Sequence, residues 1–420
     1  MRFLTCCLMS SVVLLPAAAQ AVKIKPIVDT RLRYEGVEQQ GIARDADALT
    51  LRARVGAEAT EGPFSILIEG EGTLAIDESY FSGVNRKTTY PVVADPETVE
   101  INRIQLQYKG KGLTITGGRQ RINLDDQRFV GGVAWRQNEQ TFDAARVEWS
   151  PIKDVKLDVV YSWSVRTIWG VDGGTRGFTN RPQAMSGDDI FVNGSYKTPY
   201  GLLTGFFYRI DEDENVVALR RNSSNTYGLR FAGSRPLSKA VKWNYIVSYA
   251  HQQDNGTNPL DYSADYFLAE GGLDIGAWKL GAGVEQLGAD RSVLTKATGA
   301  RFPAGFAFMT PFATLHKFNG WADKFLTTPA QGLTDYYGSI GYGLKKVGPF
   351  DTITATAMYH RFNSDIAGIH YGDELNLQLV AKMKKYTFLA KYADYQRKGI
   401  ASYAGDADTK KLWLSVEWAF

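Results

Sequence analysis

Arginines recur at a spacing of two residues in the first third of the chain, as in Arg31 and Arg33, Arg52 and Arg54, and Arg119 and Arg121. In a β-strand this spacing points both side chains of a pair to one face. A guanidinium binds a carboxylate through two parallel hydrogen bonds, so such a face could recognise acidic groups. Six segments carry eleven cations on this face, namely Lys23, Lys25, Arg31, Arg33, Arg52, Arg54, Arg103, Lys109, Arg119, Arg121 and Arg146.

The same face carries six anions, which are Asp29, Glu35, Glu58, Glu69, Glu71 and Glu148, so cations are in excess by five. Two interpretations follow. The excess could select anions, or the charges could pair with one another and stiffen a wall. The preference for arginine over lysine favours carboxylate recognition, and ion pairing stays open.

Catalytic and metal-binding chemistry has little support in the sequence. No two of the four histidines are four residues apart and no H-E-x-x-H motif occurs, which argues against a zinc hydrolase. A serine hydrolase needs a histidine beside its serine, and only His251 and His360 are candidates. The acidic run at 211–215 lacks the glycine and spacing of an EF-hand, so we expect a solvated loop rather than a Ca²⁺ site. We predict no catalytic residue, no metal and no cofactor.

The N-terminus has the three parts of a secretory signal peptide. Arg2 is followed by an apolar stretch at residues 8–15 and by the small-residue sequence Ala19-Gln20-Ala21, which predicts cleavage before Val22. Removal of 21 of the 420 residues would leave 399. Cys6 and Cys7 would leave with the signal, so the exported protein would contain no thiol.

The elements that carry the charged face are predicted to be strands with one apolar face. At the C-terminus, Leu412, Leu414 and Val416 alternate with polar or aromatic residues, a period of two. The pattern recurs in eighteen segments of about the length that crosses a bilayer as a tilted strand, near 23–35, 48–59, 64–75, 99–109, 113–122, 141–150, 155–166, 189–198, 201–211, 225–233, 240–251, 262–273, 277–288, 335–344, 351–362, 373–382, 385–395 and 410–420.

The connections between these segments alternate between tight and long. Tight links such as 110–112 and 274–276 are followed by long ones such as 123–140 and 289–334. Short periplasmic turns and long external loops are typical of outer-membrane barrels. A soluble β-sandwich or propeller is the alternative, but the export signal, the aromatic ends of the apolar faces and the terminal Phe420 favour the barrel.

We therefore predict an all-β fold, a transmembrane antiparallel β-barrel of about 18 strands formed by a single domain over residues 22–420. The charged face must line the lumen, because a charge on the lipid side near the midplane costs several kcal/mol. A barrel of this strand number is wide enough for an aqueous channel.

The segment Gly118–Ala144, together with Val93–Glu97 and Glu100–Asn102, resembles the alginate export family of outer-membrane proteins. The resemblance implies an eighteen-stranded, monomeric conduit for an acidic saccharide, with a constriction of opposed arginines and acids. Its motif positions are Arg119, Arg121, Asp125, Asp126, Arg128, Trp135, Arg136, Gln137, Asn138, Glu139 and Asp143. With the wall arginines these give the predicted substrate pathway, Arg31, Arg33, Arg52, Arg54, Arg103, Arg119, Arg121, Asp125, Asp126, Arg128, Arg136, Glu139, Asp143 and Arg146.

The loop at 123–140 is rich in Arg, Gln and Asn, so we expect it to fold into the lumen and be held by wall charges. Its charged residues could pin the loop, contact the solute, or do both. The longest loop, 289–334, holds seven aromatic residues. We expect this loop to pack on itself, and a loop that caps the mouth or stacks on sugar rings stays the alternative.

The predicted function is a passive channel in the outer membrane of a Gram-negative bacterium, for anionic saccharides such as uronate oligomers or polymer. A general porin for small organic anions, and a surface receptor or adhesin that uses the long loops, are the alternatives. Export and uptake are equally possible physically. The expected partners are lipid, lipopolysaccharide and an anionic solute; the net charge of +3 is dispersed along the chain and offers no basic stripe for nucleic acid.

Overall fold

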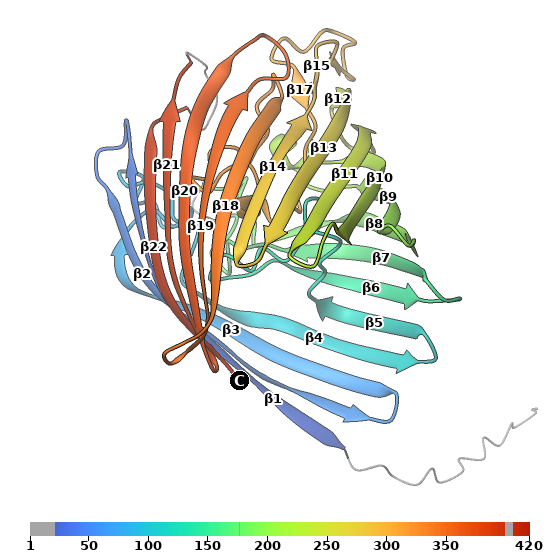
Figure 1. Ribbon diagram of the computed structural model, residues 1–420. Helices are drawn as coiled ribbons and strands as arrows, with labels where there is room; N and C mark the ends of the chain where they lie inside the picture. The colour runs from blue at the N-terminus through green and yellow to red at the C-terminus, as the bar shows by residue number, and fades with distance from the viewer. Residues whose placement is uncertain (1–21, 176, 400–405) are drawn as a thin grey trace, which may run out of the picture.

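Eighteen antiparallel strands form one closed sheet in the computed structural model, which describes residues 22–175, 177–399 and 406–420 (Figure 1). The predicted signal peptide, 1–21, lies outside the described residues. The strands are β1 (Lys23–Gln39), β2 (Ala46–Glu61), β3 (Phe64–Ser79), β4 (Thr98–Gly110), β5 (Leu113–Gln120), β6 (Thr141–Trp149), β7 (Val155–Arg166), β8 (Ala184–Lys197), β9 (Leu202–Ile210), β10 (Ser224–Pro236), β11 (Val241–Asp254), β13 (Ser263–Ile275), β14 (Trp278–Leu287), β18 (Leu333–Val347), β19 (Phe350–Asn363), β20 (His370–Met383), β21 (Tyr386–Arg397) and β22 (Thr409–Ala419).

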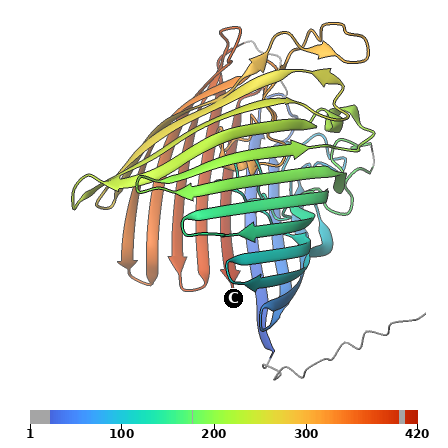
Figure 2. The same ribbon diagram turned by 90° about the vertical axis from the view of Figure 1, so that its right-hand side faces the viewer.

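The ring closes between its first and last strands. Strand β1 pairs with β2 on one side and with β22 on the other, from Asp29 opposite Ala419 to Gln39 opposite Thr409. Figure 2 shows the strands inclined to the barrel axis, as closure of a sheet requires. The predicted barrel and its eighteen segments are confirmed.

The strand ends differ from the prediction on the side of the long loops. Strand β1 continues to Gln39 instead of ending near residue 35, and β8 begins at Ala184 instead of near 189. The alternation of apolar and polar residues fades there because the strands no longer face lipid. The backbone ladder continues, since its hydrogen bonds do not depend on the apolar face.

The two faces of each strand separate as the period predicts. On β22, Leu414 is 47% exposed on the outside, whereas the neighbouring Trp413 is fully buried on the inside. Leucine, isoleucine and valine form the outer surface, and Tyr, Trp and Phe residues such as Trp149, Trp243 and Tyr342 are exposed among them. This outer surface suits lipid.

Short elements lie in the long connections. They are β12 (Leu260–Asp261), β15 (Ala289–Asp290), β16 (Leu294–Thr295), β17 (Phe306–Ala307), the helix α1 (Val217–Arg220) and the 3₁₀ turn η1 (Leu315–Lys317). Among the described residues, no helix has the length and apolar character to cross a membrane.

The interior is occupied by two inward-folded connections, which we call the inner loop (121–140, between β5 and β6) and the long loop (288–332, between β14 and β18). The long loop packs on itself only in part: β15 pairs with β17 within it, whereas aromatic residues of the loop contact the barrel wall. Phe312 contacts Phe142 of β6, with ring centres 6.0 Å apart, and Phe325 contacts Phe362 of β19 at 4.5 Å. The barrel wall offers these rings a larger apolar surface than the loop itself does.

Candidate functional site

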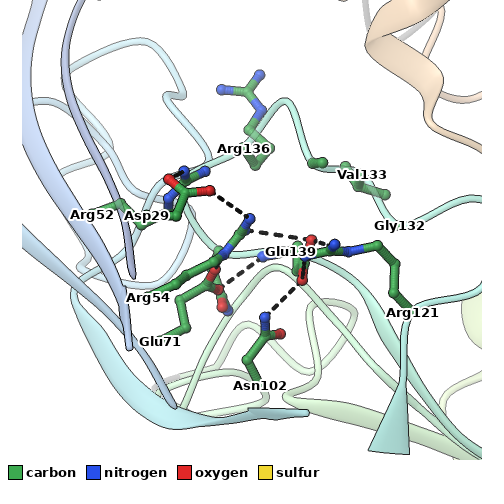
Figure 3. A network of polar contacts seen from close by, with 12 residues as sticks. Asp29, Arg52, Arg54, Glu71, Asn102, Arg121, Gly132, Val133, Arg136 and Glu139 are labelled. Atoms are coloured by element: carbon green, nitrogen blue, oxygen red, sulfur yellow. Dashed lines mark hydrogen bonds and ion pairs between the residues drawn. The ribbon is translucent and has the colours of Figure 1, made fainter. Parts of the chain in front are cut away.

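The inward-facing arginines of the first strands lie in an ion-pair network that the inner loop completes (Figure 3). Arg54 donates a hydrogen bond to Glu71 and lies 3.4 Å from a carboxylate oxygen of Glu139. On its other side Glu139 accepts hydrogen bonds from Arg121 Nε at 2.9 Å and from Asn102 Nδ2 at 2.6 Å. Glu139 therefore joins the wall to the inner loop.

The other arginines of the predicted pathway are paired as well. Each has a carboxylate partner: Arg31 with Glu417 at 3.7 Å, Arg33 with Asp95, Arg52 with Asp29, Arg103 with Glu69 at 2.6 Å, Arg119 with Asp143 at 2.7 Å and Arg146 with Asp158 at 2.6 Å. The arginines of β4, β5 and β6 use two nitrogens each, in the forked geometry that suits a carboxylate. The wall thus forms the ion-paired mesh that the sequence left as one of two interpretations.

The excess of five cations counted along the first six strands disappears in three dimensions. Five counter-charges come from outside that count. Asp143, the partner of Arg119, lies on β6, Asp95 and Glu139 lie in loops, Asp158 lies on β7, and Glu417 lies on β22, the neighbour of β1 across the closure. The pairings of the last four depend on the fold, so a count along the first six strands could not include them.

Wall side chains hold the inner loop by its backbone as much as by its charges. Arg31 donates to the side chain of Gln137 at 2.8 Å and to the carbonyl of Ala134 at 3.2 Å. Arg33 donates to the carbonyl of Trp135. Val133 has a φ of 50°, which is unfavourable for a β-branched residue, and its N–H donates to Thr314 Oγ1 of the long loop at 3.2 Å. The loop conformation is thus imposed by its surroundings.

Arg128 clamps the inner loop to the long loop and to the wall. Its guanidinium donates to Glu285 of β14 at 2.6 Å, to Thr310 at 2.8 Å and to Asn319 at 3.2 Å. Burial acts to lower the pKa of Arg128, but Glu285 outweighs burial and the pKa lies above its usual value. Arg128 is charged and fully engaged, so pinning of the loops is its structural role.

Arg136 leads to a second junction, centred on Asp323 of the long loop. Asp323 contacts Arg136 Nη2 at 2.8 Å, Lys411 Nζ of β22 at 2.7 Å and His316 Nδ1 at 2.6 Å. Arg136 also lies 3.2 Å from Glu35 of β1. We call this set the Asp323 junction; it ties the long loop, the inner loop and both closing strands together.

The protonation of the Asp323 junction follows from its contacts. The ionised carboxylate of Asp323 can only accept, so His316 Nδ1 carries the proton that it donates to Asp323, and Nε2 accepts from Lys391 Nζ at 2.8 Å. Burial holds the pKa of His316 well below its usual value. Burial acts to raise the pKa of Asp323, but its cationic neighbours outweigh burial and hold it well below normal. A neutral histidine therefore faces an ionised aspartate.

The two predicted acids, Asp125 and Asp126, lie against the part of the wall formed by β8 and β10. Asp125 accepts from Asn193 of β8 at 2.8 Å, and Asp126 lies 3.2 Å from Arg230 of β10. The structure thus brings Arg121, Glu139 and the wall arginines into one network, and places Asp125, Asp126 and Arg128 at separate anchor points of the inner loop.

A cavity of about 1090 Å³, which we call the loop cavity, lies between the inward-folded connections. It is lined by the inner loop, by the long loop and by the connection between β7 and β8, residues 167–183. Its lining includes Leu326, which is 43% exposed. The charged side chains of its lining are five cations and one carboxylate, namely Arg128, Arg136, Arg181, Lys324 and Lys411 against Asp323.

The sequence profile of the Alginate export family matches residues 28–284, more than half of the chain. This chain belongs to the alginate export family. The match covers β1 to most of β14 and includes the whole inner loop, which agrees with the family expected from the Gly118–Ala144 segment.

Solved structures show where this alginate export family barrel stands among known folds. OccAB2 of Acinetobacter baumannii is 16% identical, with 94% of this chain and 98% of that chain aligned and a TM-score of 0.68. OpdK of Pseudomonas aeruginosa, solved with vanillate, is 11% identical over 94% and 98% of the two chains, with a TM-score of 0.64. No curated protein matches the chain in sequence. The protein is thus a porin-like channel of the outer-membrane barrel class, and it is not an enzyme.

The histidines and the acidic run of this alginate export family member form no catalytic or metal site among the residues that the structure describes. His360 Nδ1 lies 2.9 Å from Asp335, but its Nε2 has no hydrogen-bond partner. His251 pairs with Asp265 at 2.8 Å. The acidic run at 211–215 is not wholly solvated as expected, because Glu212 is only 1% exposed and burial raises the pKa of its carboxyl. Within the described residues no three metal-ligating side chains converge.

Sequence reasoning missed the residues that complete the two loop junctions. Asp323, Glu285 and Lys411 lie far along the chain from Arg128 and Arg136, and no local motif marks them. For Lys411 the period of β22 did place its side chain on the inner face. Arg181 and Lys324 had no signal, because a single cation in a long loop is usually a solvated surface residue.

Proposed function

We propose that this barrel is a passive, anion-selective channel for carboxylate-bearing solutes, from small organic acids to short uronate oligomers. The observation that carries the proposal is the lining of the loop cavity, with five cations against one carboxylate. A cleft lined by one sign of charge and bounded by apolar walls concentrates ions of the opposite sign. The paired arginines of the wall set the shape of the lumen, and the loop cavity supplies the excess positive charge.

The size of the passage favours short solutes over a polymer. The loop cavity of about 1090 Å³ is close to the upper end of typical small-ligand sites. The inner loop and the long loop pack on each other through Arg128 and through Phe129 and Phe308, whose ring centres are 6.0 Å apart. The lumen is therefore narrower than the bare eighteen-stranded ring would be.

The related structures agree with this proposal in their chemistry. OpdK was solved with vanillate, which is an aromatic carboxylate, and the family is named for a polyuronate. At 11% identity the likeness to OpdK carries the fold alone, so the solute class rests on the cavity charges. We also propose that the barrel works as a monomer, because it closes its own sheet edges.

Reversal potentials in planar bilayers test the proposal. Under a potassium chloride gradient the parent protein should show a higher permeability to chloride than to potassium. D-glucuronate should reduce the chloride current, whereas glucose at the same concentration should not. Cation preference, or a current indifferent to glucuronate, would refute the proposal. Absence of any conductance in a correctly folded barrel would instead support the receptor alternative.

A further inference from the structure

The five cations of the loop cavity differ in whether they already form an ion pair with a carboxylate of the protein. Arg128 pairs with Glu285, and both Arg136 and Lys411 pair with Asp323. Arg181 and Lys324 form no ion pair with any residue that the structure describes. A cation without a counter-charge at a cavity wall is free to bind a solute anion.

Arg181 is held by rings and a carbonyl. Its guanidinium carbon lies 4.9 Å from the ring centre of Trp169, 5.2 Å from Phe81 and 5.8 Å from Phe178. Nη1 donates to the carbonyl of Gly83 at 2.7 Å. Burial lowers the pKa of Arg181, and no carboxylate offsets it. The rings fix the plane of the guanidinium and leave most of its five donors unused.

Lys324 belongs to the same lining and lies on the long loop. Its side chain is buried, with the residue 8% exposed, and Nζ donates to Thr409 Oγ1 at 2.8 Å. The charged groups around it are Lys411 of β22, Glu374 of β20, Asp323 beside it and Asp406 before β22, and the ring of Tyr395 lies 5.7 Å away. None of the acids forms an ion pair with Nζ.

We propose that Arg181 and Lys324 are the solute-binding cations of the loop cavity and bind the carboxylates of organic acids and uronates. This inference rests on the proposed function and names the site within it. Arg181 offers two parallel donors to a carboxylate, and Lys324 offers a point charge for a second carboxylate or a hydroxyl. The rest of the lining is largely apolar and includes Trp169, Met185 and Leu219, which suits a sugar or aromatic ring.

The state of Lys324 makes the site sensitive to pH. Burial, and secondarily Lys411, lowers the pKa of Lys324 to about 8. Below that pH the ammonium is charged and attracts an anion. Above it the amine is neutral, so affinity for carboxylates should fall while Arg181 keeps its charge.

The experiment measures the concentration of D-glucuronate that halves the chloride current through single channels. Arg181→Gln should raise it about tenfold, because a forked, charge-assisted contact is lost. Lys324→Gln should raise it about threefold at neutral pH. Between about pH 7 and about pH 9 the parent value should rise by a similar factor, and the Lys324→Gln value should stay constant. Arg301→Gln is the matched control, since Arg301 is an exposed cation of the same loop outside the cavity lining.

The outcomes separate this inference from the function on which it rests. If the parent is anion-selective and blocked by glucuronate, but Arg181→Gln and Lys324→Gln behave like Arg301→Gln, the site assignment is overturned and the proposed function stands. If the parent itself prefers cations, the proposed function fails. Arg181→Lys guards against misfolding, because it keeps the charge, loses the fork and should give an intermediate value.

Discussion

The buried carboxylate of Glu139, in the inner loop, is shared by two arginines and joins this loop to the wall. Glu139 receives Arg54 from β2, Arg121 from the inner loop and Asn102 from β4, and its own N–H donates to Glu71 at 3.0 Å. Burial acts to raise the pKa of Glu139, but the two arginines outweigh burial and hold it below the usual 4.5. The ionised form is therefore the one that the folded state prefers.

Replacement of Glu139 by glutamine tests this assignment. The isosteric amide removes the charge and leaves Arg121 without a carboxylate, so we expect a loss of about 3 kcal/mol in the free energy of unfolding, measured by urea unfolding in micelles. Because the folded pKa is depressed, the stabilisation by Glu139 is present above pH 4.5 and is lost as the pH falls through its folded pKa. The gap between parent and variant should therefore narrow in acid.

Glu78→Gln is the control for that measurement. Glu78 forms one ion pair, with Lys87 at 2.7 Å, and both side chains are exposed. Such a pair contributes at most about 1 kcal/mol, so the urea midpoint should stay close to that of the parent. Equal effects of Glu78→Gln and Glu139→Gln would contradict the central role of Glu139.

At the level of single residues, the sequence predicted to which face a side chain points better than it predicted the residue with which that side chain pairs. The two-residue spacing of Arg31 with Arg33 and of Arg52 with Arg54 was enough to place these side chains inside the barrel, where they are buried. Their partners depend on which strands and loops become neighbours. Glu417 meets Arg31 only because β22 closes on β1, and no local pattern contains that information.

At the level of elements, the inner loop and the long loop behave as one packed body within the barrel. The Asp323 junction and Arg128 link them, and Glu374 of β20 accepts the N–H of Ala322 at 2.9 Å. Loops held by this many buried polar contacts should move little. A channel that contains them should show a steady current.

Asp323→Asn should loosen this packed body. The change leaves Lys411 without a carboxylate and Arg136 with Glu35 alone. We expect more frequent fluctuations of the single-channel current and a larger mean conductance, while anion preference is kept or increased because a negative charge is lost. Asp213→Asn, on an exposed residue of an external loop, should leave the current trace unchanged. A current trace of Asp323→Asn identical to that of the parent would contradict the role of the Asp323 junction in holding the two loops.

The strands were predictable as elements and the loop packing was not. A period of two survives wherever one face meets lipid, so all eighteen strands left a signal. The aromatic residues of the long loop have no period, and their partners Phe142 and Phe362 lie on distant strands. The inner loop was expected to enter the lumen from its composition, but the contacts that hold it come from the fold.

At the level of the whole molecule, the predicted export step can be checked directly. We expect the protein purified from the outer membrane to begin at Val22, followed by Lys23 and Ile24, and to lack both cysteines. N-terminal sequencing and intact mass would show this. A protein that retains Met1, or that reacts with a thiol reagent, would contradict cleavage before Val22.

The net charge of +3 says little about a barrel in which charges are sorted by compartment. The arginines of the wall are paired because loops and closing strands supply acids, whereas the lining of the loop cavity carries five cations against one carboxylate. Selectivity should therefore depend on a few positions, and changes to the paired wall should affect stability more than ion preference.

The pairing of β1 with β22 also determines when the barrel can close during assembly. Asp29 pairs with Ala419, which lies about 390 residues later in the chain. The ring therefore cannot close until almost the whole chain has reached the membrane. The Asp323 junction spans the same seam, because Arg136 reaches Glu35 on β1 and Asp323 reaches Lys411 on β22. A chain that stops before β22 therefore lacks its last hydrogen-bonded strand and the Lys411 contact of its long loop, so the barrel is complete only when the final strand is in place.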